Sequence, residues 1–218
     1  GAEPKRPDVA QPEEIHIAAP AFDGDSAFSY IQKQVDFGPR VPNSREHVAC
    51  GDWLALELQR HGAEVVEQPG RVRAYDGTVL EMRNIIGQFR PENSERIMLY
   101  AHWDTRPFAD KDSTRTREPI DGANDGASGV GVLLEVARQL GQRPSDVGVD
   151  IIFFDAEDYG KPEWLPPTEN GYRDWCLGSQ YWAENPHRPG YRARFGILLD
   201  MVGASDASFH QEGTSLKY

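Results

Sequence analysis

Residues 147–158 read VGVDIIFFDAED, an apolar run that ends in acidic side chains. The apolar run predicts a β-strand buried in a core. Acidic side chains rarely follow a core strand without a partner, because an ionised carboxylate loses its hydration there. Asp155, Glu157 and Asp158 therefore form either a solvated strand end or a site for a metal ion and proton transfer.

The second half of the chain alternates between apolar strands and helices. Strand patterns occur at RIMLYAHWD (96–104) and ARFGILLDMVG (193–203), and helical patterns occur at GASGVGVLLEVARQL (126–140) and LGSQYWAEN (177–185). This alternation predicts an α/β fold with three layers, α/β/α, around a mixed, largely parallel central sheet. In sheets of this kind, active sites lie beyond the carboxyl ends of the strands.

The first half predicts two helices and a hairpin. A helix is expected over 26–35, and the Pro-punctuated loop FGPRVPNS (37–44) leads into a second helix. Asn43 and Glu46 have the spacing of a capping box at the start of that helix. The run RVRAYDGTVLEMRNIIGQF (71–89) predicts two strands joined by a turn at Asp76-Gly77. These hairpin strands make the predicted sheet mixed.

Length and composition predict one catalytic domain with an arm. The chain has 218 residues, of which 39% are apolar, enough for a core. Residues 1–24 are rich in proline and acidic side chains and predict an extended arm, and residues 25–218 form the predicted domain. We expect this domain to be truncated at its C-terminus, because the chain stops after a strand and a loop. Long loops at about 107–123 and 160–175 are expected to be functional.

Charge and apolar patterning exclude two classes of partner. The formal net charge of −12 argues against nucleic acid as a partner. No apolar run is long enough for a transmembrane segment. Cys50 and Cys176 fit no metal-binding spacing, and each is most simply a buried thiol.

Acidic residues follow three predicted core strands in the same way. His102 and Asp104 end the first strand, the acids quoted above end the second, and Asp200 lies near the end of the third. Asp125 lies in a Gly-rich turn just before a helix. If the three strands are parallel neighbours, these groups meet at one rim. Carboxylates with an imidazole form a ligand set that suits zinc, and a divalent cation removes the repulsion between clustered carboxylates.

Each of these residues also has a simpler explanation. His102 could be a core histidine with its hydrogen bonds satisfied, and Asp125 could cap the following helix. Asp104 lies on the same strand face as His102. Its carboxylate could therefore also accept a hydrogen bond from the second ring nitrogen of a ligand histidine. Glu157 and Asp158 can serve one site only if the strand has ended and the backbone turns between them.

Other reaction classes find little support in the sequence. No G-x-S-x-G motif is present, and neither cysteine has the surroundings of a nucleophile. No G-x-x-x-x-G-K-[ST] phosphate loop is present, and the acid inside the Gly-rich turn would repel a pyrophosphate.

Five motifs in order carry a family resemblance. The segments AHWD, GANDGASGVGVLLEVAR, IIFFDAED, LGSQYWA and ILLDMVGA resemble the zinc-dependent exopeptidase family, which contains zinc aminopeptidases and the animal-type glutaminyl cyclases. The resemblance covers residues 38–204. The segments GPRVPNS and FFDAEDYGKPEWLPP are most similar to those of glutaminyl cyclases, and the absence of the paired cysteines of the animal enzymes points to a bacterial-type member.

The resemblance implies a zinc site. Asp125 and Asp158 match two ligands, and the third, a histidine, is expected beyond Tyr218. The family usually has Glu where this chain has Asp158, so the metal must lie closer to the backbone here. The family also implies a cis peptide bond after Asp125.

The resemblance further implies roles in catalysis and substrate binding. Glu157 matches the catalytic acid/base, Asp200 matches a member of the proton relay, and Trp164 matches a tryptophan of the substrate pocket. The implied reaction converts an N-terminal Gln to pyroglutamate with release of ammonia, with one Zn²⁺ and peptide or protein substrates that have a free N-terminus. The family usually acts outside the cytoplasm, so we expect an exported, periplasmic or lipid-anchored protein.

Two alternatives stay open. In a two-zinc aminopeptidase, His102 and Asp200 would hold a second metal, Asp125 would bridge the two ions, and Glu157 would activate water. The third possibility is an inactive binding module with the same fold.

Overall fold

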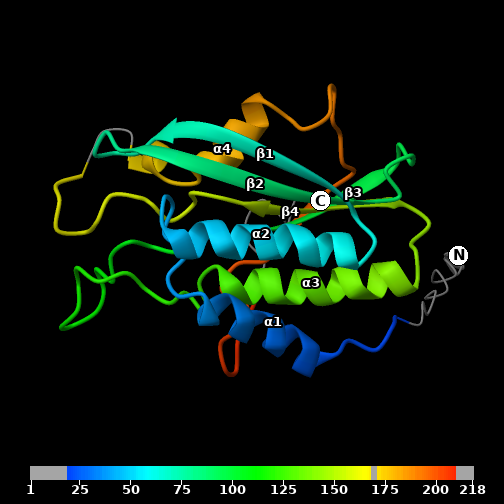
Figure 1. Cartoon of the computed structure of the whole chain (residues 1–218), viewed down its shortest axis with the longest axis horizontal. Coiled ribbons are helices and arrows are strands. Elements are labelled where there is room, and N and C mark those ends of the chain that lie inside the picture. The colour runs from blue at the N-terminus through cyan, green and yellow to red at the C-terminus, as the bar shows by residue number, and fades with distance from the viewer. Residues whose placement is uncertain (1–18, 168–170, 210–218) are drawn as a thin grey trace, which may run out of the picture.

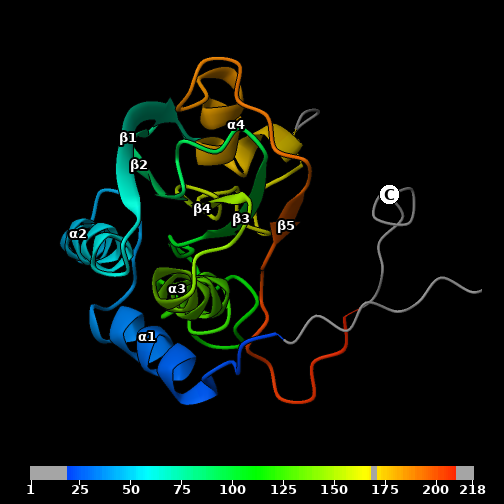
Figure 2. The same cartoon turned by 90° about the vertical axis from the view of Figure 1, so that its right-hand side faces the viewer.

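The computed structural model describes residues 19–167 and 171–209, and it has the predicted three layers. Helices α2 (Arg45–Arg60) and α3 (Ala127–Gln142) cover one face of a central sheet, and α4 (Leu177–Glu184) packs on the other face (Figure 1). Helix α1 (Gly24–Asp36) lies on the outer side of α3 (Figure 2). A short 3-10 helix, Gly171–Asp174, precedes α4.

Within the described residues, the sheet has five strands in the order β1-β2-β4-β3-β5. These are β1 (Glu64–Arg73), β2 (Val79–Phe89), β3 (Arg96–His102), β4 (Gly148–Phe154) and β5 (Gly196–Leu198). The mixed α/β/α fold is confirmed, but the sheet is less parallel than predicted. Only β4–β3 and β3–β5 are parallel, because the hairpin strand β2 pairs antiparallel with both β1 and β4.

Strand β4 is the centre of the core, and every one of its residues is buried. Its side chains alternate between the two faces, as the pleat requires. Ile151 and Phe153 pack in the cluster under α2 and α3, together with Leu54 and Leu133. Ile152 belongs to the cluster on the opposite face. Removing a large side chain here would leave a cavity, so Phe153→Ala is expected to cost about 3–5 kcal/mol of stability.

The start of α2 differs from the prediction by one residue. Ser44, and not Asn43, is the N-cap: its side chain accepts a hydrogen bond from the His47 amide at 3.1 Å. An N-cap needs an extended backbone, which Ser44 has, whereas Asn43 has φ 74°. The Asn43 side chain instead accepts a hydrogen bond from the Glu81 amide at 2.9 Å.

The hairpin turn is at the predicted place. Gly77 has φ 88°, which favours glycine, and Asp76 accepts a hydrogen bond from the Thr78 amide at 2.9 Å. The third predicted core strand is shorter than expected, because only Gly196–Leu198 pairs with β3 before the backbone leaves the sheet.

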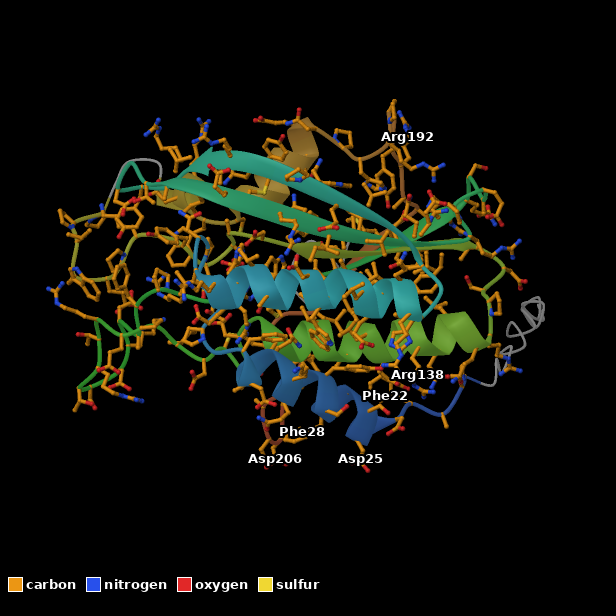
Figure 3. The ribbon with its side chains drawn as sticks, viewed as in Figure 1. Phe22, Asp25, Phe28, Arg138, Arg192 and Asp206 are labelled. Carbon is orange, nitrogen blue, oxygen red and sulfur yellow. The ribbon has the colours of Figure 1, made fainter. Side chains whose placement is uncertain are left out.

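Helix α1 begins two residues before the predicted start. The side chain of Asp23 accepts a hydrogen bond from the Ser26 amide at 3.1 Å and caps the helix. Figure 3 shows Asp25 and Phe28 on the outer side of α1, away from α3. Residues 1–18 of the predicted arm lie outside the described residues, so the predicted boundary between arm and domain stays a prediction. Within the described ranges, no helix combines the length and the apolar character that crossing a membrane requires.

The two long loops leave the sheet at the carboxyl ends of β3 and β4 and lie side by side (left in Figure 1). Arg106 of the first loop donates a hydrogen bond to the carbonyl of Asp158 in the second, at 3.1 Å. The Glu163 amide donates one to Asp110 at 3.0 Å. This end of the sheet is where the predicted site residues are expected.

Candidate metal centre and active site

His102, Asp125 and Asp200 bring their side chains together beyond the end of β3. His102 Nε2 lies 3.0 Å from Asp125 Oδ1 and 3.6 Å from Asp200 Oδ1. One potential ligand atom from each residue lies within 4.8 Å of the other two. The predicted strand ends therefore do meet, because β3, β4 and β5 are parallel neighbours.

Several buried polar atoms in this cluster lack a hydrogen bond. Both ring nitrogens of His102 and Oδ2 of Asp158 are buried without a hydrogen-bond partner among the described residues. The nearest carboxylate oxygens lie 3.0 to 3.9 Å from the ring nitrogens, at ion-pair distance. Leaving such atoms unpaired costs free energy, and a bound metal ion would satisfy Asp158 Oδ2 or one ring nitrogen of His102. Imidazole and carboxylate donors fit zinc, so the residues present fit the expected ion.

Asp158 is a carboxyl group that favours its protonated form. Its side chain is almost fully buried. Burial raises the pKa of Asp158 to about 8, and the charges of Asp125, Asp104 and Glu157 add to this effect. A bound cation would reverse this balance by stabilising the carboxylate.

The backbone turns directly after β4, as the two-acid site requires. Ala156 has a left-handed backbone with φ 50°. The two backbone amides that follow donate hydrogen bonds to the side chain of Asp104. Asp104 Oδ1 accepts from the Glu157 amide at 3.0 Å, and Oδ2 accepts from the Asp158 amide at 3.1 Å. The predicted partnership of Asp104 with His102 is looser, since Oδ1 lies 3.5 Å from His102 Nδ1 without a hydrogen bond.

Glu157 lies between a histidine and a thiol. Its Oε2 is 3.9 Å from His102 Nδ1, and its Oε1 accepts a hydrogen bond from Cys176 Sγ at 3.3 Å. Burial raises the pKa of Glu157, while the neighbouring His102 acts in the opposite direction. A carboxylate with a raised pKa is suited to accept and return a proton near neutral pH.

Asp155 has a separate, structural position. It is fully buried, and its oxygens lie 2.8 and 2.9 Å from His47 Nε2. Asp155 also accepts hydrogen bonds from the amides of Arg83, at 2.6 Å, and Ala156, at 2.7 Å. The His47 ring stacks on Trp103 with centroids 4.3 Å apart. This network anchors the end of β4 to α2.

Asp125 does not cap α3. The N-cap position is Gly126, which has φ 90° and makes no side-chain cap hydrogen bond. A Cβ atom on Gly126 would lie 2.7 Å from the carbonyl oxygen of Asp104, so the close approach of the two ends of the β3–α3 loop requires glycine here. The implied cis peptide after Asp125 is not found, since all peptide bonds in the described ranges are trans.

An open cavity of about 560 Å³ lies beside Asp125 and Asp158 and is lined mainly by residues of the two long loops. Its wall includes Phe108, Arg106 and Trp175, and the Arg106 guanidinium lies 4.5 Å from the Trp175 ring centre.

Trp164 does not line the cavity itself, although the resemblance implies that it lines the substrate pocket. It is 38% exposed, and its ring packs edge-on against Phe108 with centroids 5.2 Å apart. Phe108 lines the cavity, whereas Trp164 contacts that wall from the neighbouring loop. A role of Trp164 in substrate binding stays a prediction.

Sequence patterns do not single out Arg106 or Cys176. Both reach the site through contacts between segments about 20 to 50 residues apart, Cys176 with Glu157 and Arg106 with Asp158. Cys50 and Cys176 are both free thiols; Cys50 is buried as expected, whereas Cys176 is partly exposed. The histidine expected beyond Tyr218 as a third ligand stays a prediction.

Comparison with known proteins identifies the family. The sequence profile of peptidase family M28 matches residues 84–216. A Zn-dependent exopeptidase from Parabacteroides distasonis is 57% identical, with a TM-score of 0.88, over 92% of this chain and 68% of that chain. Bacteroides thetaiotaomicron glutaminyl cyclase, solved with N-acetylhistamine, is 56% identical, with a TM-score of 0.89, over 92% of this chain and 69% of that chain.

A curated relative is more distant. The aminopeptidase YwaD of Bacillus subtilis is 32% identical over 127 residues, which are 56% of this chain and 22% of that protein. The chain thus spans about two thirds of the solved relatives and less than a quarter of this curated one. Since the family profile matches more than half of the chain, the protein belongs to peptidase family M28.

Proposed function

We propose that the protein is a zinc-dependent glutaminyl-peptide cyclotransferase, which converts an N-terminal Gln to pyroglutamate and releases ammonia. The observation that carries this proposal is the position of Glu157, a partly buried carboxylate with a raised pKa, beside atoms of His102 and Asp158 that lack a hydrogen bond. The similarity to a glutaminyl cyclase at 56% identity supports the same reaction.

Glu157 supplies the proton transfers in the proposed reaction. The α-amine of the substrate bonds to Cδ, the carbon of its own side-chain amide, while the Cδ–Nε2 bond breaks. Glu157 accepts a proton from the amine and returns it to the departing nitrogen, so ammonia leaves and no water is consumed. Zinc held by Asp125 and Asp158 would supply the Lewis acid that polarises the carbonyl of the side-chain amide. One zinc ion per chain suffices for this reaction.

His102 and Asp200 extend the site behind Glu157. The imidazole lies between Glu157, 3.9 Å from Nδ1, and Asp200, 3.6 Å from Nε2. The Asp200 carboxylate has a lowered pKa because of the neighbouring imidazole, so it stays ionised. This arrangement supports a role of Asp200 in a proton relay through His102.

The loops supply the substrate pocket in this proposal. Trp175 and Phe108 give the cavity an apolar wall next to the acids, which suits the methylene groups of a Gln side chain. Excluding water favours cyclisation, because water at the same carbon would give hydrolysis. The acidic residues and the net charge of −12 suit a substrate that enters with a free amine.

A two-zinc aminopeptidase is the second candidate, and one observation favours it. His102, Asp125 and Asp200 form a cluster that could hold an ion in addition to the one at Asp158. In that enzyme Glu157 would activate water for attack on the peptide bond. The convergence of all these groups at one rim argues against an inactive binding module.

Product analysis separates these candidates. The complete protein is incubated with Gln-peptides and with Leu-amide, and zinc per chain is measured in parallel. Ammonia release from Gln-peptides with one zinc supports the cyclase. Released Leu with two zinc ions contradicts it in favour of the aminopeptidase, and absence of both products with no bound zinc supports a binding module. Action outside the cytoplasm stays a prediction from the resemblance, and cell fractionation tests it.

A further inference from the structure

Arg40 is a buried cation that the proposed reaction does not use. Its side chain is fully buried in the loop before α2. No carboxylate in the described ranges lies within ion-pair distance of it. Burying an unpaired guanidinium is costly, so its surroundings must compensate.

The guanidinium of Arg40 binds the backbone of the Gly-rich turn. Nη2 donates a hydrogen bond to the carbonyl of Gly122 at 2.9 Å, and Nη1 donates to the carbonyl of Asp121. The fork of the guanidinium thus holds two successive carbonyls, three and four residues before Asp125. The backbone carbonyl of Arg40 also accepts a hydrogen bond from the Thr105 amide at 3.2 Å, next to Asp104.

The turn is packed closely against this guanidinium. A Cβ atom on Gly122 would lie 3.0 Å from Arg40 Nη2 and 2.6 Å from the Asp125 carbonyl oxygen. Gly122 also has φ 60°, which favours glycine. The position of the Asp125 backbone is therefore linked to the Arg40 side chain through direct contacts.

Arg40 also places a positive charge close to several acidic residues of the site. Burial lowers the pKa of Arg40, and the nearby carboxylates of Asp104, Asp121 and Asp125 act in the opposite direction by stabilising its charge. Clustered carboxylates repel one another when no cation is bound. An arginine, which stays protonated, offsets this repulsion at every pH of interest.

We propose that Arg40 is a positioning residue for zinc binding, which fixes the turn that carries Asp125 and balances the charge of the neighbouring acids. This inference rests on the zinc site of the proposed function. Its test uses zinc affinity, so it does not depend on whether the bound zinc serves cyclisation or hydrolysis.

The test compares the same substitution at two buried arginines. Arg40→Lys keeps the positive charge but loses the paired donors of the guanidinium that bind the two carbonyls. Arg96→Lys is the matched control, because Arg96 is also buried and holds carbonyls and a carboxylate, but it pairs with Asp150 at the other end of the sheet. Zinc affinity is measured by competition with a chromophoric chelator, and the melting temperature is measured with and without zinc.

Arg40→Lys should weaken zinc binding about 10- to 100-fold, as is typical when a group that orients a ligand is lost. Arg96→Lys should lower the melting temperature with unchanged zinc affinity. Arg40→Gln, which also loses the charge, should bind zinc more weakly than Arg40→Lys. Unchanged zinc affinity in either folded Arg40 variant overturns the proposal, and so does an equal loss in Arg96→Lys.

A measurement on the unaltered protein keeps the proposal testable if the variants do not fold. The Ala127 amide donates to the Gly122 carbonyl, which Arg40 also holds. If Arg40 fixes the turn in advance, hydrogen exchange at Ala127 is slow in the metal-free protein and changes little when zinc is added. Fast exchange that becomes slow only with zinc contradicts the proposal. An unaltered protein that binds no zinc overturns both this inference and the zinc site.

Discussion

Asp104 Oδ1 accepts the backbone amide of Glu157 at 3.0 Å, and this hydrogen bond aims the acidic turn at the metal centre. Asp104→Asn replaces one accepting oxygen with an NH₂ group, which leaves the amide of Glu157 or Asp158 unpaired. We expect a loss of about 1–3 kcal/mol in the free energy of unfolding, measured by denaturant titration of the metal-free protein.

The matched control is Asp76→Asn in the exposed hairpin turn, where Asp76 accepts a single amide. Its effect on the free energy of unfolding should stay within about 0.5 kcal/mol. An equal loss in the free energy of unfolding for the two substitutions would show that the two hydrogen bonds of Asp104 stabilise the fold no more than the single one of Asp76.

The buried carboxyl of Asp158 predicts an unusual pH dependence of stability. Its pKa is raised to about 8 in the folded chain, from an ordinary value of 3.8. Between these values the folded state holds a proton that the unfolded state has lost, so stability decreases as the pH rises. The slope for one proton is up to about 1.4 kcal/mol per pH unit.

This slope should be seen in denaturant titrations of the metal-free protein between about pH 5 and pH 8. Asp158→Asn should make it shallower, and zinc should do the same by keeping the carboxylate ionised. Stability that rises with pH over this range would contradict the assignment.

The thiol of Cys176 predicts a modest effect on turnover. Cys176→Ala removes the hydrogen bond to Glu157 Oε1, and Cys176→Ser keeps a donor there. We expect Ala to lower kcat about threefold to tenfold with little change in KM, and Ser to restore most of the loss. Cys50→Ala, at the other free thiol, should lower stability and leave kcat unchanged. A change in KM alone for Cys176→Ala would assign the thiol to substrate binding instead.

Trp175 is expected to contribute more to substrate binding than Trp164. Trp175 lines the cavity beside Arg106, whereas Trp164 is 38% exposed and contacts the wall through Phe108. Trp175→Ala should therefore raise KM for Gln-peptides about tenfold or more, with a smaller rise for Trp164→Ala. A larger rise in KM for Trp164→Ala than for Trp175→Ala in steady-state kinetics would instead support the substrate contact that the family resemblance implies for Trp164.

Local patterns in the sequence account for much of the fold. Apolar periodicity locates β4 and α3, and the order of parallel strands explains why His102 and Asp200 approach each other. The pairing of β2 with β4 was not predictable, because nothing in either strand's alternation selects its neighbour.

The details of the site depend on contacts between distant segments. Arg40 binds carbonyls more than 80 residues away in the sequence, and Cys176 reaches Glu157 across 19 residues. No periodicity or spacing predicts such partners, since they follow from how the loops pack. The start of α2 was missed for a local reason: Asn43 and Ser44 both favour N-caps, and the contact of Asn43 with the hairpin decides between them.

The central claim is that Glu157 transfers protons in a cyclisation at the zinc site, and ammonia release by Glu157→Gln tests it most directly. The unaltered protein and this variant are loaded with zinc, their zinc content is measured, and ammonia from a Gln-peptide is followed over time. We predict equal zinc content, ammonia release by the unaltered protein, and at least a roughly hundredfold lower rate in the variant. A near-normal rate of ammonia release by zinc-loaded Glu157→Gln would contradict the role of Glu157.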